Sequence, residues 1–437
     1  MIKICKANGR DELEILEKLG QRSAASDDGI SEAVRAILKN VRENGDAALR
    51  EYSERFDGGW PKRLEVGREE MESAFEATDG AFRDALIRAS SNIRRYHEKQ
   101  RTEGYEISEK EGVVLGQVSR GLDRVGLYVP GGTAAYPSTV LMNGIPAKLA
   151  GVGELIMATP PARAGAAETA FGANRDILAA AFLAGADRLF LMGGAQAIAA
   201  LAYGTETVPR VDKIVGPGNI YVATAKRLLY GVVDIDMIAG PSEILIMADS
   251  RANPAFIAAD MLSQAEHDSD AAAVLLTTDE GVAERTVAEL AAQAGKLGRR
   301  EIIEASLARY GAVIVCEGNS RMVELANQIA PEHLEIMTAE PLAMLNRIKN
   351  AGSVFCGDYA PEPLGDYYSG TNHVLPTSGT ARFASPLGVQ DFMKRMSYTY
   401  YSKEALEKAV GDVTLIAERE GLDAHAEAVR KRFSDGC

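Results

Sequence analysis

The 437-residue sequence has no run of basic residues, no closely spaced cysteine pair and no G-x-G-x-x-G dinucleotide fingerprint. Its formal net charge is −14, so its overall field repels nucleic acid and anionic membrane, and we expect neither as a partner. The four cysteines, at positions 5, 316, 356 and 437, form no CxxC motif. This argues against a disulfide scaffold or a thiolate zinc site and favours a reducing cytoplasm.

The sequence also lacks a segment typical of export or membrane insertion. The first residues, Met1 to Lys6, show no basic region followed by an apolar core, so we expect no signal peptide. The longest uncharged run, Val125 to Ala147, is long enough to cross a bilayer but contains three prolines and four glycines. This composition favours a strand, a loop and the start of a helix over a membrane helix. We therefore expect a cytoplasmic protein without a membrane partner.

What is present is typical of a globular chain with several hydrophobic cores. Hydrophobic residues make up 46% and charged residues 25% of the sequence, and at roughly 150 residues per domain the length predicts about two to four domains. The first hundred residues predict helices. One has an apolar stripe at Val34, Ile37, Leu38 and Val41, and another covers Glu69 to Gln100.

From about residue 125, short apolar strands alternate with amphipathic helices, which predicts parallel sheets covered by helices on both faces. The pattern forms two blocks, at about 125–240 and 243–360. An irregular stretch, Gly357 to Ser385, and a helical segment, Lys403 to Phe433, follow them. The predicted strands are Leu155–Thr159, Leu189–Met192, Lys213–Val215, Ile244–Ala248, Ala273–Thr277, Ala312–Cys316, Leu334–Thr338 and Ser353–Cys356. The predicted helices include Ile220–Leu229, Pro254–Gln264 and Gly281–Ala294.

The sequence has five histidines, and four of them lie in settings that suggest chemistry. The exception is His97, which follows Arg94 and Arg95 on a predicted helix, and we expect it to be a solvated surface residue. Gln264 and His267 end another predicted helix and share a face at i and i+3, so an amide oxygen and an imidazole can converge on a metal ion. Spacing alone favours the simpler interpretation that His267 caps the helix.

Adjacent acid and imidazole groups occur at Glu332 and His333, just before a predicted strand. Such a pair suits general acid–base chemistry near neutral pH. Ligands of open α/β sheets usually bind at the opposite, carboxyl ends of strands. By spacing alone, a surface dipeptide is the more common case.

The segment Gly365 to His373 concentrates a carboxylate, five other polar or aromatic side chains and an imidazole. Long connections with such a composition usually serve function, and we interpret this one so. The remaining histidine, His425, lies in the C-terminal helical segment, where a lone histidine is usually solvated.

Two short glycine-containing segments are candidates for a phosphate-binding turn: Gly193 to Gln196, and Gly216 to Asn219. Each follows a predicted strand, and glycine lets backbone N–H groups approach a pyrophosphate at a helix N-terminus. Each is equally compatible with a tight turn that binds nothing. These residues alone leave NAD as one possibility.

Taken together and in order, the motifs resemble the histidinol dehydrogenase family. The likeness extends from about residue 30 to the C-terminal helical segment. The matching segments are Val125–Gly132, Gly193–Leu201, Val211–Asn219, Ala239–Glu243, Leu262–His267, Pro331–His333, Ala351–Phe355 and Ser369–Pro376.

The resemblance implies a homodimer with one zinc ion per subunit and with NAD as the oxidant, in which the C-terminal tail serves the partner's site. The implied zinc ligands are Gln264, His267, Asp366 and His425, the last supplied by the partner subunit. The implied substrate contacts are Ser242, Gln264, His267, His333, Asp366, His373, Glu420 and His425. The implied NAD contacts are Tyr128, Gln196 and Asn219.

The resemblance also implies the activity, which is oxidation of L-histidinol to L-histidine through L-histidinal with two NAD, at the end of histidine biosynthesis. His333 would remove the alcohol proton, and Glu332 would activate the water that attacks the aldehyde. Zinc would anchor the substrate's imidazole and amine rather than activate a water molecule.

For the fold, we expect an α/β protein with two incomplete Rossmann-like, doubly wound domains and helical extensions at both ends. Residues 1–27 would form a helical extension, and 28–124 plus 243–385 a larger domain that carries most site residues. Residues 125–242 would form an inserted NAD-binding domain, and 386–437 a helical tail that reaches the partner subunit.

Three other functions remain compatible with these residues. The nearest is a zinc- and NAD-dependent dehydrogenase of another small alcohol, such as a dihydroxypropanesulfonate. A zinc hydrolase with Glu332 as the base would turn over without NAD. A non-catalytic nucleotide-binding protein would have no use for the Glu332–His333 pair.

Overall fold

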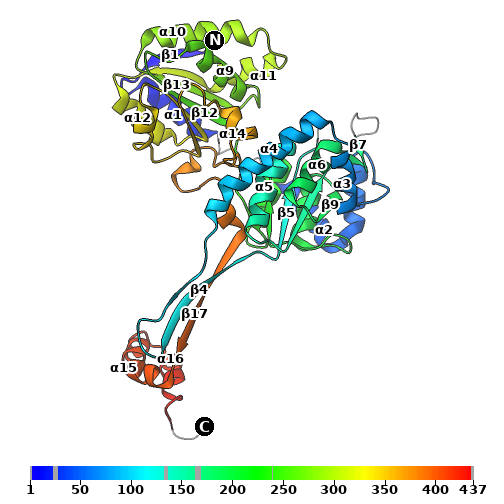
Figure 1. The fold of residues 1–437 in the computed structure, drawn as a ribbon, viewed down its shortest axis with the longest axis vertical. Helices are drawn as coiled ribbons and strands as arrows, with labels where there is room; N and C mark the ends of the chain where they lie inside the picture. The colour runs from blue at the N-terminus through cyan, green and yellow to red at the C-terminus, as the bar shows by residue number, and fades with distance from the viewer. Residues whose placement is uncertain (1, 23–27, 132–135, 163–168, 239, 435–437) are drawn as a thin grey trace.

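The structure is a computed structural model that describes residues 2–22, 28–131, 136–162, 169–238 and 240–434. The motif end Gly132, the motif start Ala239, the expected domain boundary at residue 27 and Cys437 lie outside these residues. For the described residues, Figure 1 shows two α/β bodies and a long arm that projects away from both.

The first body is built on sheet 1, in which every pair of neighbouring strands is parallel. In spatial order its strands are β1 (Lys3–Lys6), β14 (Gly311–Val315), β13 (Ala272–Thr277), β12 (Glu243–Ala248), β15 (His333–Met337) and β16 (Ser353–Cys356). The chain winds outward from β12 in one direction through β13 and β14, and then in the other through β15 and β16. The topological switch point therefore lies between β12 and β15.

Helices cover both faces of sheet 1 because alternate strand residues point to opposite sides. Ile244 and Ile246 of β12 pack in one core, and Leu245 and Met247 pack in the other. The first face is covered by α9 (Pro254–Ala265), α10 (Glu280–Ala294) and α11 (Arg300–Tyr310). The second is covered by α1 (Asp11–Gln21), α12 (Asn319–Ile329) and α13 (Pro341–Leu345).

The second body is built on sheet 2, which is parallel except for its edge strand β2. In spatial order its strands are β11 (Asp234–Ile235), β10 (Lys213–Val215), β5 (Arg124–Tyr128), β6 (Glu154–Thr159), β9 (Arg188–Leu191) and β2 (Glu65–Gly67). One face is covered by α3 (Arg68–Glu76), α4 (Gly80–His97), α5 (Pro137–Leu149) and α6 (Arg175–Ala184). The other is covered by α2 (Asp28–Phe56), α7 (Gly194–Tyr203) and α8 (Ile220–Leu229). Its switch point lies between β5 and β10.

The arm is an antiparallel sheet in the strand order β17 (Met393–Tyr401), β4 (Val113–Gly121) and β3 (Tyr105–Ile107), and it ends in two helices (Figure 1). Strand β4 pairs with β17 along its whole length, and β3 pairs with β4. At the end of the arm lie α15 (Lys403–Arg419) and α16 (Asp423–Arg430). The remaining short elements are η1 (Glu98–Gln100), β7 (Thr169–Ala170), β8 (Ala173–Asn174), α14 (Glu362–Tyr367), η2 (Thr380–Arg382) and η3 (Val389–Phe392).

The predicted fold class is confirmed, because both sheets are doubly wound and all eight predicted strands are present with bounds shifted by at most about one residue. The long helix expected over Glu69 to Gln100 is two helices, since the Asp79 side chain accepts a hydrogen bond from the Phe82 N–H and starts α4. Each terminal extension, expected to be helical, contributes a strand, β1 or β17. Both strands are rich in polar residues, which hides them from a hydrophobicity pattern.

Helices α2 to α4 cover sheet 2, whereas the sequence analysis grouped residues 28–124 with 243–385. The apolar stripe of α2 does face a core, and Val34 and Leu38 pack there with Phe190 of β9. A stripe on a helix shows which side is buried but not which of two sheets it covers. That choice depends on how the chain crosses between the bodies.

His97, expected to be a solvated surface residue, is fully buried, so that expectation was wrong. Its Nδ1 lies 2.7 Å from Gln100 Oε1, and its Nε2 lies 3.4 Å from Asn372 Nδ2. Burial lowers the pKa of this imidazole. The arginines next to it in sequence suggested solvent, but His97 lies four residues after the buried Ile93 and so shares its helix face.

No helix in the described part of the chain is long and apolar enough to cross a membrane. Cys5, Cys316 and Cys356 are free thiols, and burial raises the pKa of Cys316 to about 12.

Candidate active site

Glu332 and His333 lie at the amino end of β15, next to the amino end of β12, so they occupy the switch point of sheet 1 from its amino edge. The side chains are buried, with 7% and 5% of their residue surfaces exposed, rather than displayed as a surface dipeptide. The Nε2 atom of His373 lies 3.4 Å from Thr139 Oγ1 of α5, which belongs to the second body. The site therefore lies where the two bodies meet.

Hydrogen bonds orient the His333 ring. Its Nδ1 lies 3.1 Å from the main-chain oxygen of Glu243, and because a carbonyl can only accept, Nδ1 carries the hydrogen. Its Nε2 then has a free lone pair and lies 3.6 Å from Glu362 Oε1. This nitrogen can accept a proton from a ligand held beside Glu362.

The pKa values of the adjacent pair are displaced in opposite directions. Burial raises the pKa of Glu332 well above its ordinary value, and neighbouring carboxylates add to the rise. Burial lowers the pKa of His333 to about 4. The shifts have opposite signs because burial disfavours the charged form of each group, and the two side chains lie 3.6 Å apart, measured from Glu332 Oε2 to His333 Nδ1. Displaced pKa values of this kind are typical of functional sites.

Among the described residues, His333, Glu362 and Asp366 form one group whose ligand atoms all lie within 4.8 Å of one another, a spacing that can hold a metal ion. Asp366 also lies 3.6 Å from His373, measured from Oδ1 to Nδ1. Of the expected zinc ligands, this group contains Asp366 alone. Glu362 was not among the residues expected from the sequence, although it lies four residues before Asp366 and so shares a face of α14.

Gln264 lies in the last turn of α9 with 1% of its surface exposed, and its Oε1 has no hydrogen-bond partner in the described part of the chain. A buried amide oxygen without a donor is unfavourable by about 1–3 kcal/mol, so a cation or a donor group is expected to face it. His267 follows the end of α9, and its electrostatic interaction contributes to the lowered pKa values of both His333 and His373. The α9 end is therefore electrostatically part of the same site.

A cluster of buried carboxyl groups, Asp260, Glu335 and Glu362, lies next to this group. Glu335 Oε1 accepts a hydrogen bond of 2.8 Å from the Glu362 N–H. Burial raises the pKa of Glu335 well above its ordinary value and that of Glu362 to about 9. The sequence analysis did not single out Glu335, which lies two residues after His333 and so on the same face of β15.

Two expected site residues lie far from this group within the same chain. Glu420 follows the last residue of α15 and His425 lies on α16, and both are exposed. Figure 1 shows these helices at the end of the arm, away from both bodies. Ser242, by contrast, immediately precedes β12, and its main-chain oxygen accepts a hydrogen bond of 3.0 Å from the Ala272 N–H.

Of the expected NAD contacts, Tyr128 and Gln196 are buried around the start of α7. The Tyr128 hydroxyl accepts a hydrogen bond of 3.1 Å from the Gly194 N–H, and Gln196 Nε2 lies 3.3 Å from Asp57 Oδ2. The same Asp57 oxygen accepts from the Gly193 N–H at 3.3 Å. The first N–H groups of this turn are therefore already bonded within the chain.

In the turn from Gly216 to Asn219, Pro217 and Asn219 are exposed, whereas Gly216 is buried and its N–H donates to Asp236 Oδ2 at 2.8 Å. Asn219 is exposed and caps α8, because its Oδ1 accepts hydrogen bonds from the Tyr221 and Val222 N–H groups. Gly216 has φ +108°, and a Cβ there would lie 2.0 Å from the main-chain oxygen of Tyr128, so only glycine fits. The turn and the end of β5 thus meet at the switch point of sheet 2, where open α/β sheets bind ligands.

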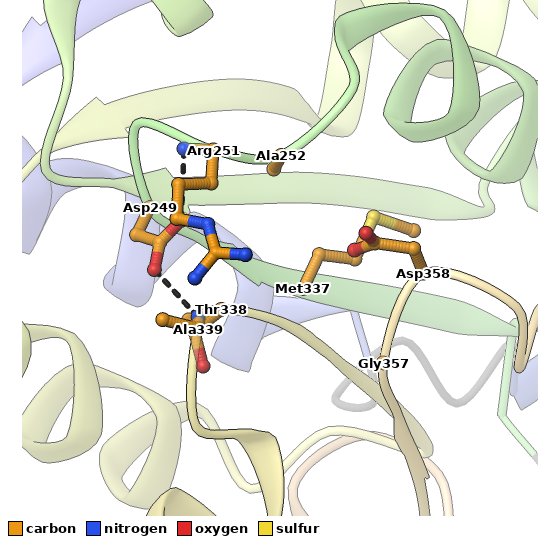
Figure 2. Close-up of a pocket in the computed structure, with 8 residues that line it drawn as sticks. All are labelled: Asp249, Arg251, Ala252, Met337, Thr338, Ala339, Gly357 and Asp358. Carbon is orange, nitrogen blue, oxygen red and sulfur yellow. Dashed lines mark hydrogen bonds between the residues drawn. The ribbon is translucent and has the colours of Figure 1, made fainter.

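Figure 2 shows a cavity of about 190 Å³ at the opposite, carboxyl edge of sheet 1, after β12 and β15. Both carboxylate oxygens of Asp249 accept main-chain N–H bonds there, from Arg251 at 2.9 Å and Ala339 at 2.7 Å (Figure 2). The carboxylate therefore holds two turns together. None of the residues that line the cavity belongs to the site built from Glu332 and His333.

Comparison with known proteins gives a consistent result over nearly the whole chain. Residues 20–433 match the family model described as histidinol dehydrogenase. The chain is 52% identical over 433 residues to the histidinol dehydrogenase of Clostridium acetobutylicum, covering 99% of each, and 51% identical over 424 residues to that of Aquifex aeolicus, covering 97% of each. The crystal structure of histidinol dehydrogenase from Elizabethkingia anophelis superposes with a TM-score of 0.90 at 36% identity, covering 99% of this chain and 98% of that one.

Proposed function

This chain belongs to the histidinol dehydrogenase family and is an oxidoreductase of histidine biosynthesis, and from that premise we propose that it oxidises L-histidinol to L-histidine in two NAD-linked steps at a zinc site shared by two subunits. The observation that carries the proposal is the buried Gln264 Oε1, which has no hydrogen-bond partner among the described residues and lies at the end of α9, where His267 interacts electrostatically with His333. An orphaned amide oxygen beside imidazole and carboxylate groups is a donor set that fits a zinc ion.

Gln264, His267 and Asp366 would hold the zinc from one subunit, and His425 of a second copy would complete it. Zinc supplies a positive centre that anchors the imidazole and amine of the substrate. We assign His333 to proton transfer, with Nε2 as the basic nitrogen, because its Nδ1–H donates to the Glu243 carbonyl and its Nε2 lies 3.6 Å from Glu362 Oε1. Asp366 belongs both to the proposed zinc ligands and to the group that it forms with His333 and Glu362, and it would contact metal and substrate.

NAD, when bound, would supply the hydride acceptor for both oxidations. In the first, His333 Nε2 would accept the proton of the substrate hydroxyl as the carbinol carbon gives up its hydride, which converts the alcohol to an aldehyde. In the second, Glu332 in its carboxylate form would take a proton from water whose oxygen bonds to the aldehyde carbon, and loss of a hydride from the resulting hydrate would give the carboxylic acid. Burial of both residues excludes bulk water from the reactive aldehyde.

We place NAD at the switch point of sheet 2, where Tyr128 ends β5 and the turn from Gly216 to Asn219 ends β10. An exposed turn at a helix start, with a glycine that lets the backbone come close, suits the pyrophosphate. Gln196 lies below it, bonded to Asp57. Binding there brings the cofactor to the second body, across the junction from His333.

The position of the arm supports a homodimer. His425 and Glu420 lie at its far end and are exposed, so they can serve a second copy but not their own site (Figure 1). The outer helices also expose large apolar side chains, including Leu415 at 55% and Ile416 at 60%. Exposed apolar surface on an extended element is typical of an interface between subunits.

The test measures how many NADH are released for each L-histidinol consumed. Full-length protein loaded with zinc should release two NADH per L-histidinol consumed and yield L-histidine, and a chelator should abolish the reaction while the helical circular-dichroism signal stays unchanged. A dihydroxypropanesulfonate serves as the control substrate and should give no NADH. Release of one NADH per histidinol, or turnover without NAD, would refute the proposed function.

A further inference from the structure

We propose that Glu243, which forms an ion pair with the buried Arg22, is a positioning residue that orients the carboxylate of Glu332 and the ring of His333 for catalysis. The inference rests on the proposed function, in which Glu332 and His333 transfer the protons. It concerns two residues that the likeness to the family did not assign, one of them from the N-terminal segment.

Glu243, the first residue of β12, is bonded to both members of the catalytic pair. Its main-chain N–H donates to Glu332 Oε2 at 2.9 Å, and its main-chain oxygen accepts from His333 Nδ1 at 3.1 Å. In return, the Glu332 N–H donates to Glu243 Oε1 at 3.2 Å. The strand start of β12 therefore fixes which oxygen of Glu332 is free and which nitrogen of His333 is basic.

Arg22 fixes Glu243 in turn. It follows the last residue of α1, and its Nη2 lies 3.4 Å from Glu243 Oε2 and 2.8 Å from the main-chain oxygen of Pro241. The side chain is 1% exposed, and its guanidinium lies over the ring of Tyr310, with its central carbon 5.3 Å from the ring centroid. One buried cation thus clamps both the side chain of Glu243 and the main chain that leads into it.

Stability alone is a weak reason for such a pair. Burying two charges is unfavourable, and an apolar pair of similar volume is often equally stable. The bonds from Glu243 go instead to the two groups that must be aligned with the substrate. Misplacing a catalytic group by about 1 Å can reduce a rate by about 100-fold.

The experiment compares Glu243→Met, Glu243→Gln and the double variant Arg22→Met/Glu243→Met in the zinc-loaded, full-length protein. It measures kcat and KM for histidinol and for histidinal, zinc content and melting temperature. We expect Glu243→Met to lower kcat by about 100-fold in both half-reactions, with KM and zinc content within about threefold of wild type. Glu243→Gln, which keeps an oxygen acceptor for the Glu332 N–H, should recover most of kcat.

The double variant distinguishes a loss of kcat caused by misplaced catalytic groups from one caused by a less stable fold. It removes both buried charges, so its melting temperature should return towards wild type while kcat stays as low as in Glu243→Met. Should Glu243→Met fail to fold, this variant and Glu243→Gln still decide the question. Recovery of kcat together with melting temperature would overturn the proposal.

The matched control is Glu12→Met. Glu12 is fully buried in the same body and lies 2.7 Å from Arg321, measured from Oε1 to Nη2, but it has no bond to Glu332 or His333. Its loss should lower the melting temperature and leave kcat unchanged. An equal fall of kcat in Glu12→Met would also overturn the positioning role. Absence of histidinol oxidation in the wild type would instead refute the proposed function.

Discussion

Subunit complementation tests the assignment of His425 to the partner's site. His425→Ala removes the proposed zinc ligand from the end of the arm, and Glu332→Gln removes the proposed water-activating group from the body. Each variant alone should be inactive in oxidising histidinal, because each leaves both sites of its homodimer incomplete. Both residues lie outside the hydrophobic cores, so each variant should fold.

The arm is too long for His425 to reach the Glu332–His333 site of its own chain. Nine paired residues of β4 and β17 at about 3.3 Å each extend the ribbon by about 30 Å before α15 begins. Continuous pairing along both strands prevents the ribbon from folding back. His425 must therefore act on a second copy if it acts on any site.

Random mixing of the two variants by co-expression puts half of the dimers in the mixed form. In a mixed dimer the subunit with intact Glu332 receives the intact tail, and the other site lacks both groups. One complete site of two, in half of the dimers, gives about 25% of wild-type activity. The assay is NADH formation from histidinal, with the two purified homodimers mixed without exchange as the control. Activity that stays at the level of the single variants would refute a shared site.

Three further predictions follow from individual residues. Glu332→Gln should slow aldehyde oxidation by about 100-fold or more and alcohol oxidation by less than about tenfold in single-turnover assays; equal losses would exclude the water-activating role. Gln264→Leu should lose zinc by metal analysis while the metal-free protein melts no lower than wild type, since the unpartnered oxygen is gone; normal zinc content would exclude Gln264 as a ligand. Burial lowers the pKa of folded His97 below its unfolded value, so the unfolded chain binds the extra proton first, and stability falls as pH drops below about 6.5 by up to ~1.4 kcal/mol per pH unit. Urea unfolding of His97→Gln should show a smaller slope, with the share of His97 removed and that of His333 and His373 kept; an unchanged slope would contradict the assignment.

Much of the candidate site could be predicted because its residues lie close together in short segments of the sequence. Gln264 and His267 share a helix face, Glu332 and His333 are adjacent, and Asp366 lies in a segment of unusual composition. The strands were equally accessible, because a fully buried parallel strand is a short apolar run between helices. Strand β17 was not, since its residues are largely exposed and show no run of apolar side chains.

The sequence by itself determined the elements of the two doubly wound sheets and the residue types that can bind a metal and move protons. Only the tertiary structure decided that His97 is buried, that helices α2 to α4 cover sheet 2, and that Arg22 reaches Glu243. It also decided that α16, which carries His425, lies at the end of the arm, away from both bodies (Figure 1). The physical reason is that hydrophobic periodicity indicates only which side of an element is buried. Contacts between residues hundreds of positions apart depend on how the chain crosses between the two sheets and on which buried charges lie next to each other.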